Sequence, residues 1–95
     1  MESGSDEQLA HLRRLADELG RRGLTAELGG GSHSPSLRAA NPQVPRLTER
    51  VLCAQARDGS WCYWWPWGQP IGPVQDVAQA VTKIAAVLRS VEGGS

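Results

Sequence analysis

Apolar side chains recur every three or four residues near both ends of the chain, which is the spacing of one face of an α-helix. The first stripe consists of Leu9, Leu12, Leu15, Ala16 and Leu19. The second consists of Val74, Val77, Val81, Ile84, Leu88 and Val91. Ser5 and Gln8 form a capping-box pattern before the first stripe, and Pro73 suits the first position of a second helix. The pattern predicts helices over residues 6–22 and 73–91.

Between these helices, apolar and polar residues alternate in short runs that are bounded by Gly, Pro, Asn and Asp, which is typical of β-strands. The predicted strands cover residues 24–28, 36–41, 48–57 and 60–65. The glycine-rich residues 29–35 are interpreted as a hairpin loop, because no Lys-Ser/Thr pair and no helix follow them as a phosphate-binding loop requires. Asp58-Gly59 predicts a second hairpin with a two-residue loop, since such turns need positive φ at both central positions.

The two-residue loop fixes which side chains share a face of the last hairpin. It pairs Ala56 with Trp61, Ala54 with Tyr63 and Leu52 with Trp65, all on one face. The opposite face then carries Val51, Cys53, Cys62 and Trp64.

The sequence therefore predicts that residues 1–95 form one small α+β domain, with frayed ends at residues 1–4 and 93–95. The expected order is α-β-β-β(-β)-α, in two layers. An antiparallel three- to four-stranded sheet carries the N- and C-terminal helices on one face, because each helix has only one apolar stripe. The second face of the last hairpin would then remain uncovered. Two alternatives stay open: one helix crosses the sheet edge, or a bulge shifts the register and exchanges the faces.

Charge argues against two classes of partner. Ten basic and ten acidic side chains give a formal net charge of zero, whereas nucleic acids and anionic membranes attract a positive field. The element order resembles that of double-stranded RNA-binding domains, but the predicted second helix has no basic residue before Lys83. There is no signal-peptide pattern, no run of 18 apolar residues and only two cysteines. We therefore expect a cytoplasmic protein with reduced thiols.

All five aromatic residues lie between Trp61 and Trp67, and the chain has no Phe. Alternation assigns Trp61, Tyr63 and Trp65 to the core and Trp64 to the surface. Trp67 follows a proline beyond the strand, where core packing explains it least. Indole rings are effective contact anchors, so the candidate partner- or ligand-binding residues are Trp64, Trp67, Cys62 and Cys53.

The residues that could carry chemistry form no recognisable catalytic or metal-binding pattern. Cys53 and Cys62 are not a C-x-x-C pair, and with His11 and His33 they match no zinc module. No catalytic residue, metal or cofactor is therefore assigned. The leading hypothesis is a non-enzymatic protein-interaction or regulatory module, with homodimerisation through the Trp-rich sheet face as one form. The alternative is a small-molecule binding domain that uses Trp67 as a stacking wall. An enzyme that uses His33 with Ser32 or Ser34 is a third hypothesis.

Three segments also carry a resemblance to known sequences. These are Leu47-Thr48-Glu49-Arg50-Val51-Leu52-Cys53, Asp58-Gly59-Ser60-Trp61 and Trp64-Trp65-Pro66-Trp67-Gly68-Gln69-Pro70-Ile71. The chain resembles small actinobacterial proteins in which a W-x-W-G-x-P-I segment similarly precedes a C-terminal helix. The resemblance covers roughly residues 8–90. It implies a compact cytoplasmic domain and brings no activity or site residue with it.

Overall fold

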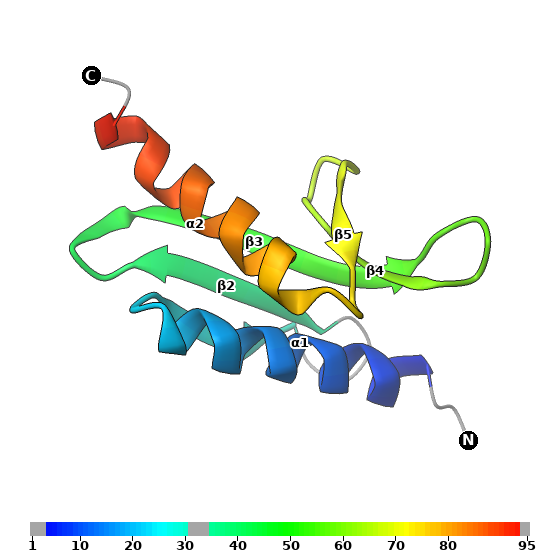
Figure 1. Ribbon diagram of the computed structural model, residues 1–95. Helices are drawn as coiled ribbons and strands as arrows, with labels where there is room; N and C mark the ends of the chain where they lie inside the picture. Colours follow the sequence, from blue (N-terminus) through cyan, green and yellow to red (C-terminus); the bar gives the residue numbers. More distant parts are fainter. Residues whose placement is uncertain (1–3, 31–34, 94–95) are drawn as a thin grey trace.

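The computed structural model describes residues 4–30 and 35–93, in the order α-β-β-β-β-β-α (Figure 1). Helix α1 spans Gly4–Arg21 and helix α2 spans Val77–Gly93. The strands are β1 Thr25–Gly29, β2 Ser36–Asn41, β3 Val44–Gln55, β4 Trp61–Trp64 and β5 Pro70–Pro73. They form one antiparallel sheet in the order β1-β2-β3-β4-β5. The predicted α+β class is confirmed, and the described residues form five strands instead of the expected three or four.

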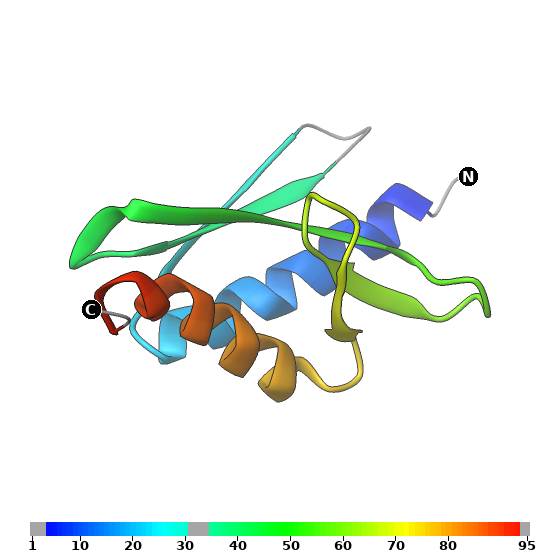
Figure 2. The ribbon, with the colours of Figure 1, turned by 90° about the horizontal axis from the view of Figure 1, so that it is seen from above.

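Both helices cover the same face of the sheet, as predicted (Figure 2). One core lies between the two layers. Its buried members are Leu12, Leu15 and Leu19 of α1, Leu37, Ala39, Val51, Cys53, Tyr63 and Ile71 of the sheet, Trp65 and Val74 beside it, and Ala80, Val81, Ile84 and Leu88 of α2. No helix among the described residues covers the opposite face of the sheet, and we call it the open face.

The register of the β3–β4 hairpin differs by one residue from the prediction. Cys53 is opposite Tyr63, and Leu52 is opposite Trp64. The loop has three residues, because the Ala56 amide donates to the Ser60 carbonyl at 2.8 Å and Gly59 takes a φ of 88°. A type I turn followed by a residue in this conformation is the usual three-residue hairpin loop. A one-residue shift moves every β3 side chain to the other face, so the predicted β3 assignment was wrong.

The segment Trp65–Gln69 forms a second turn of the same kind. The Gly68 amide donates to the Trp65 carbonyl at 2.9 Å, the Trp65 amide donates to the Gln69 carbonyl at 2.8 Å, and Gly68 has a φ of 90°. Pro66 takes the second position of the turn, which a type I turn favours for proline. The W-P-W-G segment thus reverses the chain into β5, a strand that the prediction missed.

Two further boundaries differ from the prediction by four residues. Pro42 and Gln43 form the turn before β3, and the Gln43 amide donates to Asn41 Oδ1 at 2.9 Å, so β3 begins at Val44 and not at residue 48. Helix α2 begins at Val77 and not at Pro73, because β5 uses that proline. Asp76 precedes the helix, and its Oδ1 accepts from the Gln79 amide at 3.3 Å in the manner of an N-cap.

Candidate functional site

The part of the open face where β3 pairs with β4 is apolar. Leu52 and Trp64 are directly opposite each other there, and Ala54 is opposite Cys62. All four side chains are half-buried. The Trp64 indole Nε1 donates to the Ala54 carbonyl at 3.1 Å, so the ring reaches across to the neighbouring strand. We call these four residues the apolar strip.

The two cysteines lie on opposite faces of the sheet, because the shifted register moves Cys53 to the core side. Cys53 is buried and pairs with Tyr63, whereas Cys62 is half-buried in the apolar strip. Burial raises the pKa of the Cys53 thiol to about 12, with smaller contributions from Cys62 and Glu7. A neutral buried thiol is a poor nucleophile and metal ligand. Of the two predicted contact cysteines, only Cys62 lies on the open face.

The predicted division of the aromatic residues between core and surface is confirmed for Tyr63, Trp65 and Trp67. Trp61, predicted in the core, and Trp64, predicted at the surface, are both half-buried. Tyr63 and Trp65 are buried, Trp61 packs partly buried against the core, and Trp67 is 59% exposed. The Trp67 ring stacks on Trp65, with centroids 5.3 Å apart and planes 5° from parallel. Its Nε1 donates to Gln69 Oε1 at 3.1 Å. One face of Trp67 is therefore occupied by Trp65, and the turn itself holds the ring in place.

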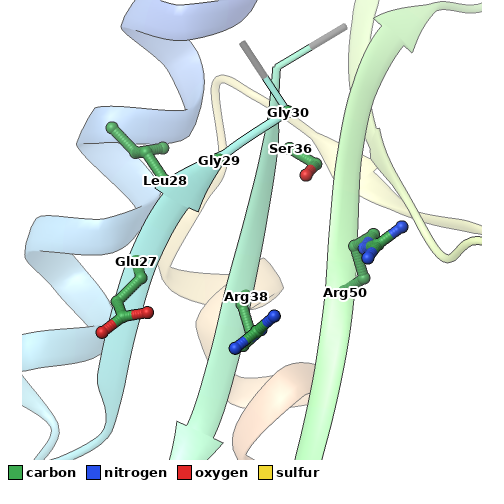
Figure 3. Close-up of a pocket in the computed structure, with 7 residues that line it drawn as sticks. All are labelled: Glu27, Leu28, Gly29, Gly30, Ser36, Arg38 and Arg50. Carbon is green, nitrogen blue, oxygen red and sulfur yellow. The ribbon is translucent and has the colours of Figure 1, made fainter.

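The other half of the open face is polar, and it carries two adjacent arginines (Figure 3). Arg38 of β2 is directly opposite Arg50 of β3, and Glu27 of β1 is opposite Arg38. The three residues form a row across three strands. They line a shallow hollow of about 160 Å³ together with Leu28, Gly29, Gly30 and Ser36.

A second shallow hollow adjoins the first at the same two arginines. Its lining is Arg38, Thr48, Glu49, Arg50 and Pro66. Pro66 belongs to the turn between β4 and β5, which rises from the sheet on the side away from the helices (Figure 2). The arginine pair thus lies in a trough that this turn bounds on one side.

Two polar side chains on the helix side form hydrogen bonds between α1 and the sheet. The Tyr63 hydroxyl donates to the His11 carbonyl at 2.8 Å, and Gln8 Nε2 donates to the Cys53 carbonyl at 2.9 Å. The His11 ring lies 5.6 Å from Trp61, and its Nε2 is buried without a hydrogen-bond partner. These contacts hold α1 against β3 and β4.

Within residues 4–30 and 35–93, no three His, Cys, Asp or Glu side chains are grouped as a metal site. The described helices include none that is long and apolar enough to cross a bilayer. Ser32, His33 and Ser34, the residues of the enzyme hypothesis, lie outside the described residues.

The sequence prediction placed Trp64, Trp67 and Cys62 where the structure exposes them in part. It missed Leu52, because the two-residue loop assigned that side chain to the core. It also missed the arginine pair, since the opposition of Arg38 and Arg50 depends on an irregularity at Ala40/Asn41 that shifts the β2–β3 register. The Pro-x-Gly order of residues 66–68 was the available signal for the β4–β5 turn.

Comparison with known proteins adds no relative to this description. No family model, curated protein or solved structure matches the chain.

Proposed function

We propose that this protein is a non-enzymatic interaction module whose open sheet face docks a short segment of a partner protein. The observation that carries the proposal is the position of both helices on one face, which leaves Leu52 and Trp64 uncovered on the other. A sheet normally buries its apolar face against another layer. Apolar side chains on an uncovered face are typical of surfaces that bind another molecule.

The size of the apolar strip favours a short segment over a second copy of the chain. A stable dimer buries about 800 Å² on each partner. The strip has only four side chains, and all of them are already half-buried. A symmetric face-to-face dimer would also bring the arginine pairs of both copies toward each other, because Arg50 lies on the middle strand of the sheet.

The state of the cysteines and the net charge of the chain support a cytoplasmic module that binds a protein. The thiols of Cys53 and Cys62 are free and lie on opposite faces, which suits a reducing compartment. We therefore propose a cytoplasmic location for the module. Its neutral formal charge favours a protein as partner over a nucleic acid or an anionic membrane.

A small-molecule site at Trp67 is the second candidate. The observation that favours it is the 59% exposure of an indole whose other face is fixed on Trp65. A flat ligand would stack on the outer face of Trp67 and quench its fluorescence. A metabolite screen in which Trp67→Ala abolishes the quenching would support this function. Quenching that survives this substitution would exclude it.

The docking proposal is tested by selecting peptides from a display library on the wild-type protein. The selected peptides are then measured against Leu52→Gln and against Leu47→Gln. Leu47 is a matched control, because it is a half-buried leucine of the same strand that packs against the core and lines neither hollow. Helical circular dichroism checks that both variants fold.

We expect the selected peptides to bind the wild type and Leu47→Gln alike, and to lose at least about fivefold in affinity for Leu52→Gln. Equal binding to Leu52→Gln would overturn docking on the open face. Sedimentation at low micromolar concentration is expected to show a monomer. A dimer that Leu52→Gln dissociates would identify a second copy as the occupant and contradict the proposal.

A further inference from the structure

Arg38 and Arg50 form a like-charged pair at directly opposite positions of adjacent strands. Such a pair is unfavourable when nothing neutralises it, because cross-strand side chains lie about 5 Å apart at Cβ. Both arginines are exposed, and neither makes an ion pair or hydrogen bond with another described residue. Their donors are free to bind an anion.

The hollow beside the pair supplies a further donor. The Ser36 side chain extends from β2 toward β3 in Figure 3, and its hydroxyl has no partner within the described part of the chain. Arg38 and Arg50 project from the same side of the sheet, which is the side away from the helices. Guanidinium groups bind carboxylates through two parallel N–H donors, which makes this combination well suited to an oxyanion.

The charge of the hollow matches one negative charge. Arg38 and Arg50 contribute two positive charges, and Glu27 in the same lining contributes one negative charge. Glu49 lines only the adjoining hollow, and it lies opposite Ala39, which is a core position on the helix side. A carboxylate would neutralise the remaining charge. A phosphate group, with a charge approaching −2 at pH 7, would leave an excess beside the Glu27 carboxylate. Nucleic-acid binding would also require several more basic residues along the surface.

The apolar strip begins next to the arginine pair. Arg50 and Leu52 are two residues apart on β3 and lie on the same face, so their positions are separated by about 7 Å. Trp64 is opposite Leu52. The same separation of about 7 Å joins residues i and i+2 of an extended peptide, whose side chains also point to one face.

We propose that Arg38, Arg50 and Ser36 bind the carboxylate of an acidic side chain in the partner segment. An apolar side chain two residues away in that segment contacts Leu52 and Trp64. The recognised element is thus an extended stretch with an acidic residue at position i and an apolar residue at i+2. This inference rests on the proposed docking function, and it names the chemistry of the partner.

The inference is tested with a blocked seven-residue threonine peptide that carries glutamate at its third position and leucine at its fifth. Two control peptides replace the glutamate by glutamine or move the leucine next to it. Binding is followed through the backbone amide and Trp64 indole signals in ¹H–¹⁵N spectra. The protein variants are Arg38→Gln, Arg50→Gln and Arg50→Lys. Arg13→Gln, at an exposed position of α1, is the control with an equal change of charge.

We expect the glutamate peptide to shift the signals of β2, β3 and Trp64, and both control peptides to bind at least about fivefold more weakly. Arg38→Gln and Arg50→Gln should weaken binding about tenfold, Arg50→Lys less, and Arg13→Gln not at all. Absence of binding by the wild type would overturn the inference, as would equal binding by the two glutamine variants.

Two further outcomes separate this inference from the docking proposal. Library-selected peptides that require Leu52 but bind Arg38→Gln and Arg50→Gln normally would refute the carboxylate site and leave the docking function standing. Binding of a phosphoserine version of the peptide, or of a single-stranded RNA decamer, in preference to the glutamate peptide would show that the arginine pair selects phosphate. That result would also overturn the inference.

Discussion

Tyr63 and Cys53 are opposite each other on the core side of the sheet, and burial raises the pKa of both side chains. Burial raises the pKa of Tyr63 to about 12, with Cys53 adding to the effect and Arg14 opposing it. The pKa of Cys53 is likewise raised to about 12. Both groups therefore keep their protons in the native state well beyond the pH at which an unfolded chain releases them.

This pair predicts a loss of stability at high pH. The unfolded chain loses its thiol and phenol protons near pH 9 and 10, whereas the native state holds them to about pH 12. Because the native state binds more protons in this window, the free energy of unfolding falls as pH rises, by about 1.4 kcal/mol per unit for each group. Urea denaturation at pH 7, 9.5 and 11 measures the loss.

Tyr63→Phe isolates the contribution of the phenol. At pH 7 we expect it to cost about 1 kcal/mol, because the hydrogen bond from the hydroxyl to the His11 carbonyl is lost. Above pH 10 its stability should fall less steeply than that of the wild type. Parallel pH profiles for the two proteins would contradict the role assigned to Tyr63.

The cysteines should differ in their reaction with a thiol reagent. Cys62 is half-buried on the open face, whereas the Cys53 side chain is 3% exposed. In the native protein at pH 8 we expect Cys62 to react at least about tenfold faster than Cys53, which requires an opening of the structure. Mass spectrometry after timed labelling measures both rates, and Cys62→Ser removes the fast phase. Similar rates for the two thiols would contradict their assignment to opposite faces.

At the scale of elements, two turns determine which side chains reach the open face. Each places a glycine at positive φ after a type I turn, at Gly59 and Gly68. The first sets the β3–β4 register, and the second directs the chain into β5. A loop of two residues in place of three would exchange the faces of β3 and bury Leu52.

Gly68→Ala is therefore expected to destabilise the protein by about 1 kcal/mol. The cost is conformational, because a φ of 90° is unfavourable for alanine although no atom lies within 4 Å of the added Cβ. Gly72→Ala is the matched control in the same hairpin, since Gly72 has equal space and no positive φ. Chemical denaturation should show little change for Gly72→Ala. Equal losses for the two variants would contradict the conformation assigned to the turn.

The elements also show how far the sequence alone could reach. The apolar stripes predicted both helices and their common face, because periodicity reports directly on burial. Asp58-Gly59 predicted the hairpin but not its register, since the same dipeptide suits loops of two or three residues. The prolines around β5 indicated a broken strand, yet Pro70 and Pro73 are compatible with an edge strand, where an amide donor is dispensable.

The candidate site was harder to predict than the fold, for a physical reason. Trp64 and Cys62 could be placed on one face by alternation along a single strand. The arginine pair depends on how β2 pairs with β3, and that pairing contains an irregularity between Ala40 and Asn41. Local sequence patterns do not show where the register between two strands shifts. The proximity of Arg38 and Arg50 could therefore not be inferred from the sequence.

At the scale of the whole molecule, the described residues form a five-stranded sheet and two helices, and both helices lie on one side of the sheet. The molecule is elongated, with extents of 46 × 25 × 23 Å. Its open face combines the apolar strip with the arginine pair. The face therefore offers one contact for an apolar side chain and another for a carboxylate within a short distance.

Cys62 supplies a natural reporter for occupation of this face, because it lies in the apolar strip beside Trp64. The most direct test is its labelling rate in the presence of a saturating peptide selected on the wild-type protein. We predict that the bound peptide slows the labelling of Cys62 at least about threefold, because it covers the strip. An unchanged rate at saturation would show that the peptide binds elsewhere, and it would contradict docking on the open face.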